Sequence, residues 1–314
     1  MSNDVIVIGS INMDIVIKTK EIPKIGETVI GRESIENPGG KGANQAVALA
    51  KLGAKVGFLG MVGNDTNGKK LISSMKEYGV DTSLIESVEG TSGTAFIAVD
   101  DRGNNNIIVV PGANNKVDKR YLNEHIDAIK ESKIVLLQHE IPKETVKDAI
   151  LLSKRLGKTT VLNPAPAHCL EDEVLKNVDI LIPNEHELAR ISNRKIKDIG
   201  SVVEASRDLI NIGMGVPKII TTLGENGAIY VDADRVQYFY PIPTDVVDTT
   251  AAGDSFIGGF LYCYVFTKDI FKSIEFGQKV ASITIQRYGA QVSLPTLKEV
   301  NGYSLPSYNG GMLN

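Results

Sequence analysis

Residues 248–256, DTTAAGDSF, place three very small side chains directly before an acid. They follow a predicted strand at 236–247 and precede an apolar, predicted helix. The unpaired N–H groups and partial positive charge of a helix start favour an anion there. Because residues 251–253 have almost no side chain, phosphate oxygens could approach their backbone closely. Asp254 could then accept a proton from an attacking hydroxyl. Taken alone, the string is more simply explained by Asp254 as an N-cap.

Two further segments could contact a small ligand. GGKGANQA at 39–46 also begins a predicted helix, but it is not a Walker A loop, because Gly42 stands where Ser or Thr must follow the lysine. The absence of GxGxxG after the first strand disfavours a dehydrogenase. GSINMD at 9–14 places Asn12 and Asp14 just past that strand, where they could bind adjacent hydroxyls. Tight helix packing and a backbone-bonded turn are the respective alternatives.

The composition is that of a globular protein acting on something small. The chain has 314 residues, 42% hydrophobic and 23% charged, with a net charge of -4. Such a balance gives no reason to expect nucleic acid, and no apolar run is long enough to span a membrane. The two cysteines, Cys169 and Cys263, form no CxxC pattern, and HEIPK at 139–143 lacks the second histidine of a zincin. We therefore expect a cytoplasmic protein without disulfides or structural zinc.

Short apolar runs alternate with helical patterns, which predicts βαβ units. The expected fold is α/β, a mostly parallel central sheet flanked by helices. Two alternating segment pairs, at about 14–35 and 94–110, predict a small antiparallel β lid. No linker divides residues 1–300, so we expect a single domain, followed by a flexible tail at 301–314. The main predicted strands lie at 5–10, 55–63, 133–138, 159–163, 178–183 and 218–223, with a hairpin at 228–241.

Seven segments in this order resemble the ribose-phosphorylating members of the PfkB carbohydrate kinase family. The resemblance covers about residues 4–300 and includes both ends of that family's active site. Seven spaced matches outweigh the separate structural explanations given above for each segment. The segments are GSINMD, NPGGKGANQA, LNPAPA (162–167), PNEHE (183–187), TTLGENGA (221–228), DTTAAGDSF and RYGAQVSLP (287–295).

The resemblance implies a catalytic centre and a sugar site. Asp254 would be the base on the sugar's terminal hydroxyl, and Ala251, Ala252 and Gly253 would form the anion hole for the phosphoryl group. His139 departs from the pattern, since an apolar residue is common there, and it adjoins one of the sugar residues. The implied sugar contacts are Asn12, Asp14, Gly40, Lys41, Gly42, Asn44, Glu140 and Asp254.

The resemblance also implies ATP with Mg²⁺, and K⁺ as an activator. Asn184 and Glu187 match an N-x-x-E motif that organises magnesium, largely through water. The implied nucleotide contacts are Asn184, Thr222, Leu223, Gly224, Glu225, Asn226, Gly227, Gly253, Asp254 and Gln278. The implied monovalent-cation site comprises Asp248, Thr250, Thr284, Arg287, Gly289 and Ser293, several through backbone carbonyls.

The implied reaction is ATP-dependent phosphorylation of D-ribose at its 5-hydroxyl. Two alternatives stay open: a kinase of the same family for deoxyribose, fructose or a nucleoside, and a non-catalytic sugar sensor. The lid predicts a homodimer, because small isolated hairpins are marginal in water and each needs a partner for its apolar face. The positions expected to be buried between two lids are Ile15, Ile17, Val29, Phe96, Ile108 and Val110.

Overall fold

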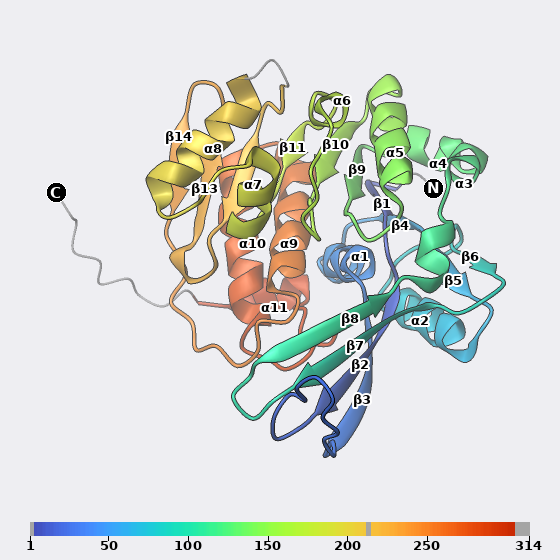
Figure 1. Cartoon of the computed structure of the whole chain (residues 1–314). Coiled ribbons are helices and arrows are strands. Elements are labelled where there is room, and N and C mark those ends of the chain that lie inside the picture. Colours follow the sequence, from blue (N-terminus) through green and yellow to red (C-terminus); the bar gives the residue numbers. More distant parts are fainter. Residues whose placement is uncertain (1–2, 212–214, 305–314) are drawn as a thin grey trace.

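The computed structural model describes residues 3–211 and 215–304, and its centre is an eight-stranded sheet (Figure 1). The strand order is β14-β13-β12-β11-β10-β9-β1-β4. Six strands pair in parallel, and the edge hairpin β13–β14 is antiparallel. The bounds are β1 Val5–Ile8, β4 Val56–Leu59, β9 Ile134–Leu137, β10 Thr159–Leu162, β11 Ile180–Leu181, β12 Ile219–Thr222, β13 Ala228–Val231 and β14 Val236–Phe239.

Helices cover both faces of this sheet, which explains why its parallel strands are continuously apolar. Val5 and Val7 point into one core with α1, α9 and α10, and Ile6 and Ile8 point into the other with α5 and α8. The first set is α1 Lys41–Lys51, α2 Thr66–Glu77, α9 Ala252–Thr267 and α10 Ile270–Thr284, with α11 Leu297–Gly302 against α10. The second is α3 Lys119–Glu124, α4 Ile126–Glu131, α5 Lys143–Arg155, α6 Asp172–Leu175, α7 Glu185–Ser192 and α8 Ile199–Asn211.

Helices α1, α9 and α10 pack unusually closely because glycines line their contacts. A methyl group at Gly258 of α9 would lie 2.4 Å from Ala48 Cβ of α1, and one at Gly259 would lie 2.8 Å from Val280 of α10. Such distances leave no room for a side chain. The helix starts of α1 and α9 are thereby held at the same end of the sheet.

The lid is a separate four-stranded sheet that projects from the body beside α2 (Figure 1). Its strands are β2 Asn12–Lys18, β3 Glu33–Gly39, β7 Gly93–Val99 and β8 Asn105–Val110. The two predicted antiparallel pairs are present, and a parallel β2–β7 pairing that the sequence did not predict joins them. The second strand expected within 14–35 begins only at Glu33, so Val29 lies outside it. A small parallel pair, β5 Met61–Gly63 and β6 Glu86–Val88, lies nearby.

Asn114 fastens the base of the lid. It belongs to the 3₁₀ turn Gly112–Lys116, which follows β8. Its Oδ1 accepts from the Ile11 backbone N–H at 2.9 Å, and its Nδ2 donates to Asn12 Oδ1 at 2.7 Å. Because both amide groups of this buried side chain are used, the exit from β8 is tied to the start of β2.

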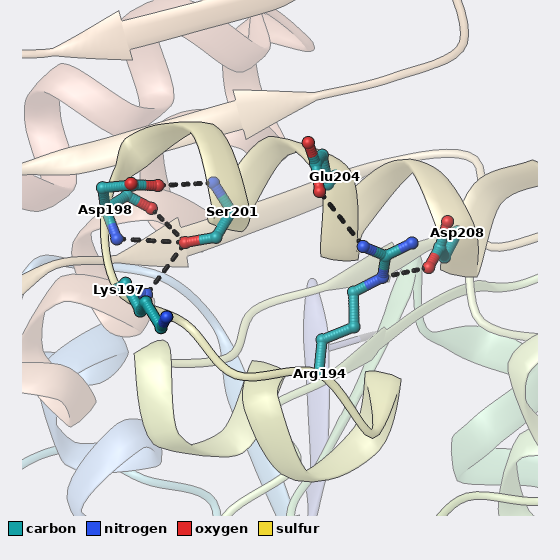
Figure 2. A network of polar contacts seen from close by, with 6 residues as sticks. All are labelled: Arg194, Lys197, Asp198, Ser201, Glu204 and Asp208. Atoms are coloured by element: carbon teal, nitrogen blue, oxygen red, sulfur yellow. Dashed lines mark hydrogen bonds and ion pairs between the residues drawn. The ribbon is translucent and has the colours of Figure 1, made fainter.

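A polar network fixes the corner between α7 and α8 (Figure 2). The Arg194 guanidinium bonds Glu204 and Asp208, one turn apart on α8. The Ser201 N–H donates to Asp198 Oδ1 at 2.8 Å, which starts α8. Exposed ion pairs contribute little singly, but this network ties Arg194, which follows the end of α7, to two residues of α8.

Three predictions near the C-terminal part need correction or stay open. The strand expected at 236–247 ends at Phe239, and an irregular connection leads to α9. The boundary expected at 300 falls inside α11, and residues 305–314 of the predicted tail lie outside the described residues. Within the described ranges, no helix combines the length and apolar character needed to cross a membrane.

Candidate active site

The carboxyl ends of the parallel strands meet at one edge of the sheet, where α/β folds place ligands. A polar cavity of about 240 Å³ opens there. Its lining comes from α1, α7, α9 and the strand ends: Lys41, Asn163, Ala165, Ile182, Asn184, Glu187, Thr222, Thr249, Ala251, Ala252, Gly253, Asp254 and Ile257. The structure thus unites the predicted anion hole, Asp254, the N-x-x-E motif and the predicted nucleotide residue Thr222 around one space.

Asp254 is the third residue of α9, so the N-cap explanation of this aspartate is wrong. The N-cap is Ala251, whose left-handed backbone (φ 60°) turns the chain into the helix. The Ala252 N–H donates to Thr249 O at 3.1 Å, whereas the N–H groups of Gly253 and Asp254, in the first turn of the helix, are left without a backbone acceptor. Nothing lies within 4 Å of a methyl group placed at Gly253, so this stretch faces open space. That geometry suits an anion at the start of α9.

The Asp254 carboxylate is buried and held by two amides from α1. Its Oδ2 accepts from Asn44 Nδ2 at 3.0 Å, and its Oδ1 accepts from Gln45 Nε2 at 2.9 Å. Each oxygen keeps a second lone pair. The carboxylate is therefore fixed in direction while still able to accept a proton from a ligand in the cavity.

A chain of buried amides that the sequence analysis missed extends from these two contacts. Gln45 also donates to Asn163 Oδ1 at 3.1 Å and accepts from Gln138 Nε2 at 2.6 Å. On the other side, Gln291 Nε2 donates to Asn44 Oδ1 at 3.3 Å. Gln45 adjoins Asn44, and Gln138 lies two residues before Glu140, while Asn163 and Gln291 lie within two of the quoted segments. Position in or beside these motifs was therefore the available signal.

Acidic groups surround Lys41 on the lid side of the cavity. Burial, with the carboxylates of Glu140 and Asp254, raises the pKa of Asp14 to about 7, and Lys41 offsets only part of this. Burial would lower the pKa of the Lys41 ammonium, but the surrounding carboxylates, Asp254 and Glu140 foremost, hold it above its ordinary value. A methyl group at Gly39 would lie 2.1 Å from Asp14 Oδ2, so the carboxylate lies directly over that glycine.

Glu140 is held independently of its unusual neighbour His139. Its Oε2 accepts from Ser10 Oγ at 2.6 Å and from the Lys41 N–H at 3.1 Å. The His139 ring packs beside His168 with centroids 5.7 Å apart, and burial together with His168 lowers its pKa to about 4. The departure at His139 leaves Glu140 in place at the start of α1.

The remaining predicted sugar residues form the junction between β1 and α1. Asn12 accepts from Asn114 through Oδ1, which leaves its NH₂ group to donate. Methyl groups at Gly40 and Gly42 would lie 2.8 Å from Asn12 N and 2.7 Å from Ser10 N. Gly40 also has φ 91°, a conformation that favours glycine. Both glycines are therefore required by close packing, whatever their contact with a ligand.

Asn184 and Glu187 form a capping box at the start of α7. The Asn184 N–H and Nδ2 donate to the two Glu187 oxygens at 2.8 and 2.9 Å, and the Glu187 N–H donates back to Asn184 Oδ1 at 2.8 Å. Burial raises the pKa of Glu187. Each side-chain oxygen has one protein donor and one free lone pair, and both residues line the cavity. This donor set fits Mg²⁺ held through water, because Mg²⁺ takes oxygen ligands and keeps several waters.

The predicted nucleotide residues divide into two groups. Thr222 pairs with Asn184 in a parallel bridge, and the 3₁₀ turn Gly224–Asn226 continues from it. A methyl group at Gly227 would lie 2.1 Å from Phe239 O, so this glycine packs against the end of β14. Gln278 on α10 donates to Tyr240 O at 3.1 Å and is outside the cavity lining.

The predicted cation residues join two loops. Asp248 accepts from the Thr250 N–H at 2.9 Å and the Gly289 N–H at 2.9 Å, which closes one loop against the other. The hydroxyls of Thr284 and Ser293 donate to backbone carbonyls of their own segments. The Arg287 guanidinium donates to Glu299 Oε1 at 2.8 Å, so the predicted role of Arg287 in the cation site would fall to its backbone. Across the described residues, no group of three or more His, Cys, Asp or Glu side chains could hold a metal ion.

Comparison with known proteins identifies the family of this site. Residues 2–297 match the family described as pfkB family carbohydrate kinase. The chain belongs to this family. A Lactococcus lactis ribokinase is 39% identical over 296 residues, 94% of each chain. A Salmonella typhi deoxyribokinase is 34% identical over 302 residues, 96% of this chain and 98% of the relative.

The fold is shared with solved members of the pfkB family. A structure of Arabidopsis thaliana ribokinase complexed with ribose and ATP is similar at a TM-score of 0.90 and 31% identity, covering 96% of this chain and 98% of that chain. The predicted pfkB-family resemblance and the predicted α/β sheet with flanking helices are confirmed.

The raised pKa of Asp14 predicts a pH-dependent stability for this pfkB kinase. Folded Asp14 keeps its proton where the unfolded chain has lost it, so its contribution is greatest below the unfolded pKa of 3.8 and is lost as pH rises to about 7. Asp14→Asn removes this loss. Urea unfolding at about pH 5 and about pH 8 should show the variant gaining stability relative to wild type at the higher pH.

The exposed Asp127 supplies the control, since its side chain is 85% accessible. Asp127→Asn should differ from wild type equally at both pH values. An Asp14→Asn difference that is also the same at both values would contradict the assigned burial of the Asp14 charge.

Proposed function

We propose that this pfkB-family kinase transfers the γ-phosphoryl group of ATP to the 5-hydroxyl of D-ribose. The observation that carries the proposal is the buried Asp254 carboxylate, fixed by two amides beside the open N–H groups that begin α9. The ribokinase relatives support ribose as the acceptor, and the Arabidopsis ribokinase complexed with ribose and ATP supports both substrates.

In the proposed step, Asp254 accepts the proton of the sugar hydroxyl as its oxygen attacks the γ-phosphorus. The bond from that phosphorus to the bridging oxygen of ADP breaks, which yields ribose 5-phosphate and ADP. The N–H groups of Gly253 and Asp254 donate to the transferring oxygens, where negative charge is concentrated. Bound Mg²⁺ neutralises charge on the phosphates, and Asn184 and Glu187 would hold it through water.

The sugar would lie between Asp254 and the base of the lid. Asp14 and Glu140 offer acceptors to its hydroxyls, while the Asn12 NH₂ group and the Lys41 ammonium offer donors. The phosphates of ATP would extend from α9 past Lys41 toward Thr222 and Gly224. The single domain at 1–300 and a cytoplasmic location belong to the same proposal.

The alternative acceptors are deoxyribose, which lacks one hydroxyl group, fructose, which has one more carbon, and nucleosides, which carry a base. The deoxyribokinase relative at 34% identity shows that overall similarity separates ribose from deoxyribose only weakly. A non-catalytic sensor is disfavoured, because a sensor has no use for a base beside an anion site. Comparison of kcat/KM among the candidate acceptors decides between them.

The first prediction from this proposal concerns the catalytic base. Asp254→Asn keeps the size of the side chain but removes the proton acceptor, so kcat should fall by about 10²- to 10⁴-fold. ATP binding, measured by calorimetry, should change little. A variant that keeps more than about a tenth of the wild-type kcat would show that Asp254 is not the base.

The second prediction concerns the acceptor. A site built to pair with hydroxyls leaves its own polar groups unpaired when one hydroxyl is missing, so 2-deoxyribose should lose roughly 5- to 150-fold in kcat/KM against ribose. Fructose should also be poorer, because overfilling a packed site is costly. Asp14→Ala should raise KM for ribose strongly and spare KM for ATP. Equal kcat/KM for ribose and deoxyribose, or a higher kcat/KM for fructose, would contradict the assignment of ribose as the preferred acceptor.

We also propose K⁺ as an activator. The loops joined by Asp248 present backbone carbonyl and hydroxyl oxygens, which are ligands suited to a large monovalent cation. One loop leads directly into the N–H groups at the start of α9. A cation bound to these loops would hold the backbone at the start of α9 in place, on the side away from the phosphate.

The third prediction is a potassium response. Replacing sodium by potassium at constant ionic strength should raise kcat several-fold, since the cation steadies the anion-binding backbone. Asp248→Ala removes the acceptor of the Gly289 N–H, so this variant should show a smaller rise in kcat with potassium. The same kcat in both salts for the wild type would contradict the cation site.

A homodimer through the lids completes the proposal. Ile17, Phe96, Ile108 and Val110 are 36%, 41%, 67% and 44% exposed, while Ile15 already packs against the chain's own core. Register places Phe96 beside Ile108, so these side chains form a continuous apolar strip on one face of the lid. Apolar strips of this kind mark interaction sites.

The fourth prediction tests this assembly. Sedimentation velocity at micromolar concentration should give a dimer for the wild type and a monomer for Ile108→Glu, because the new charge would be buried at the interface. Val236→Glu, at an apolar position 40% exposed on β14, is the matched control and should stay dimeric. A wild-type monomer would overturn the dimer.

A further inference from the structure

We propose that Gln45 is a positioning residue that aims the Asp254 carboxylate, an inference that rests on the proposed role of Asp254 as base. Gln45 is fully buried on α1 and lines none of the cavity. Its NH₂ group donates to Asp254 Oδ1 at 2.9 Å. It therefore acts on the base and not on a ligand.

The orientation of the Gln45 amide is fixed from both ends. Its Oε1 accepts from Gln138 Nε2 at 2.6 Å, at the end of β9. Its second N–H donates to Asn163 Oδ1 at 3.1 Å, at the end of β10, and Asn163 in turn donates to Ile182 O at 2.9 Å. A flipped Gln45 amide would turn its oxygen toward the Asp254 carboxylate and its NH₂ toward the Gln138 donor.

This chain connects the base to the rigid part of the fold. Asp254 belongs to α9, whereas Gln138 and Asn163 follow two central strands of the sheet. Asn44 holds the other carboxylate oxygen, but its own support is a longer contact of 3.3 Å from Gln291. Gln45 is thus the more firmly anchored of the two amides.

The alternative explanation is a purely structural one, in which Gln45 only satisfies the hydrogen bonds of buried polar groups in the core. That role would affect stability, and loss of Gln45 would then lower kcat only as far as it unfolds the protein. A positioning role instead separates kcat from substrate binding, because a misdirected carboxylate still leaves the sugar and nucleotide contacts intact.

The test compares Gln45→Met with Gln286→Met under conditions in which both are folded. Gln286 is half-buried and donates to Ser282 O at 2.8 Å and to Tyr303 Oη at 3.1 Å, so its variant loses side-chain hydrogen bonds that do not involve the Asp254 carboxylate. Gln45→Met should lower kcat about 10- to 100-fold with little change in KM for ribose or ATP. Gln286→Met should keep the wild-type kcat.

A second variant serves if Gln45→Met does not fold. Gln45→Glu keeps the shape and the acceptor for Gln138 but replaces the donated bond by a second carboxylate against Asp254. Its kcat should fall further than that of Gln45→Met, and the loss should lessen as pH falls and the new glutamate gains a proton.

The outcomes separate the inference from the proposed function. If Asp254→Asn is inactive while a folded Gln45→Met keeps the wild-type kcat, Gln45 does not position the base and the inference fails alone. If Asp254→Asn itself stays active, the proposed base is wrong and the inference falls with it. A lowered kcat with unchanged KM in Gln45→Met supports the inference.

Discussion

The arrangement of this site depends on the bonds from two neighbouring amides of α1 to the carboxylate of Asp254 on α9. Those bonds require the two helix starts to lie close together, and the packing of Gly258 on Ala48 makes this possible. A side chain at that contact would separate the helices and with them the base from its donors. The apolar packing of α1 and α9 therefore sets a polar geometry about one turn away.

Charge balance is the second constraint on the cavity. The carboxylates of Asp14, Glu140 and Asp254 all act on Lys41, which lies at the start of α1. Burial of a carboxylate and the grouping of acids are both costly, and the raised pKa of Asp14 reflects the two together. The same grouping suits the two substrates: hydroxyls need acceptors near the lid, and phosphates need the ammonium and the α9 N–H groups. In the proposed reaction, the Lys41 ammonium would lie between an acceptor-rich side for the sugar and a donor-rich side for the phosphates.

The sequence predicted those parts of the structure whose chemistry shows locally. The apolar run at 5–10 predicts a buried strand, and the small residues before Asp254, taken together with the other six segments, predict an acid beside an anion site. The parallel β2–β7 pairing was missed, because pairing between distant segments leaves no local pattern. Gln45 and Gln138 were missed for a similar reason: an amide shows its role only when the fold brings its partners to both ends.

The most direct test of the account is a crystal structure of the protein with ribose and a non-hydrolysable ATP analogue. The account predicts the ribose 5-hydroxyl oxygen at about 2.6–3.2 Å from an Asp254 carboxylate oxygen. It also predicts the terminal phosphate on the N–H groups at the start of α9, with Asn44 and Gln45 still bonded to Asp254. A ribose whose 5-hydroxyl lies away from Asp254, or a phosphate away from the start of α9, would contradict it.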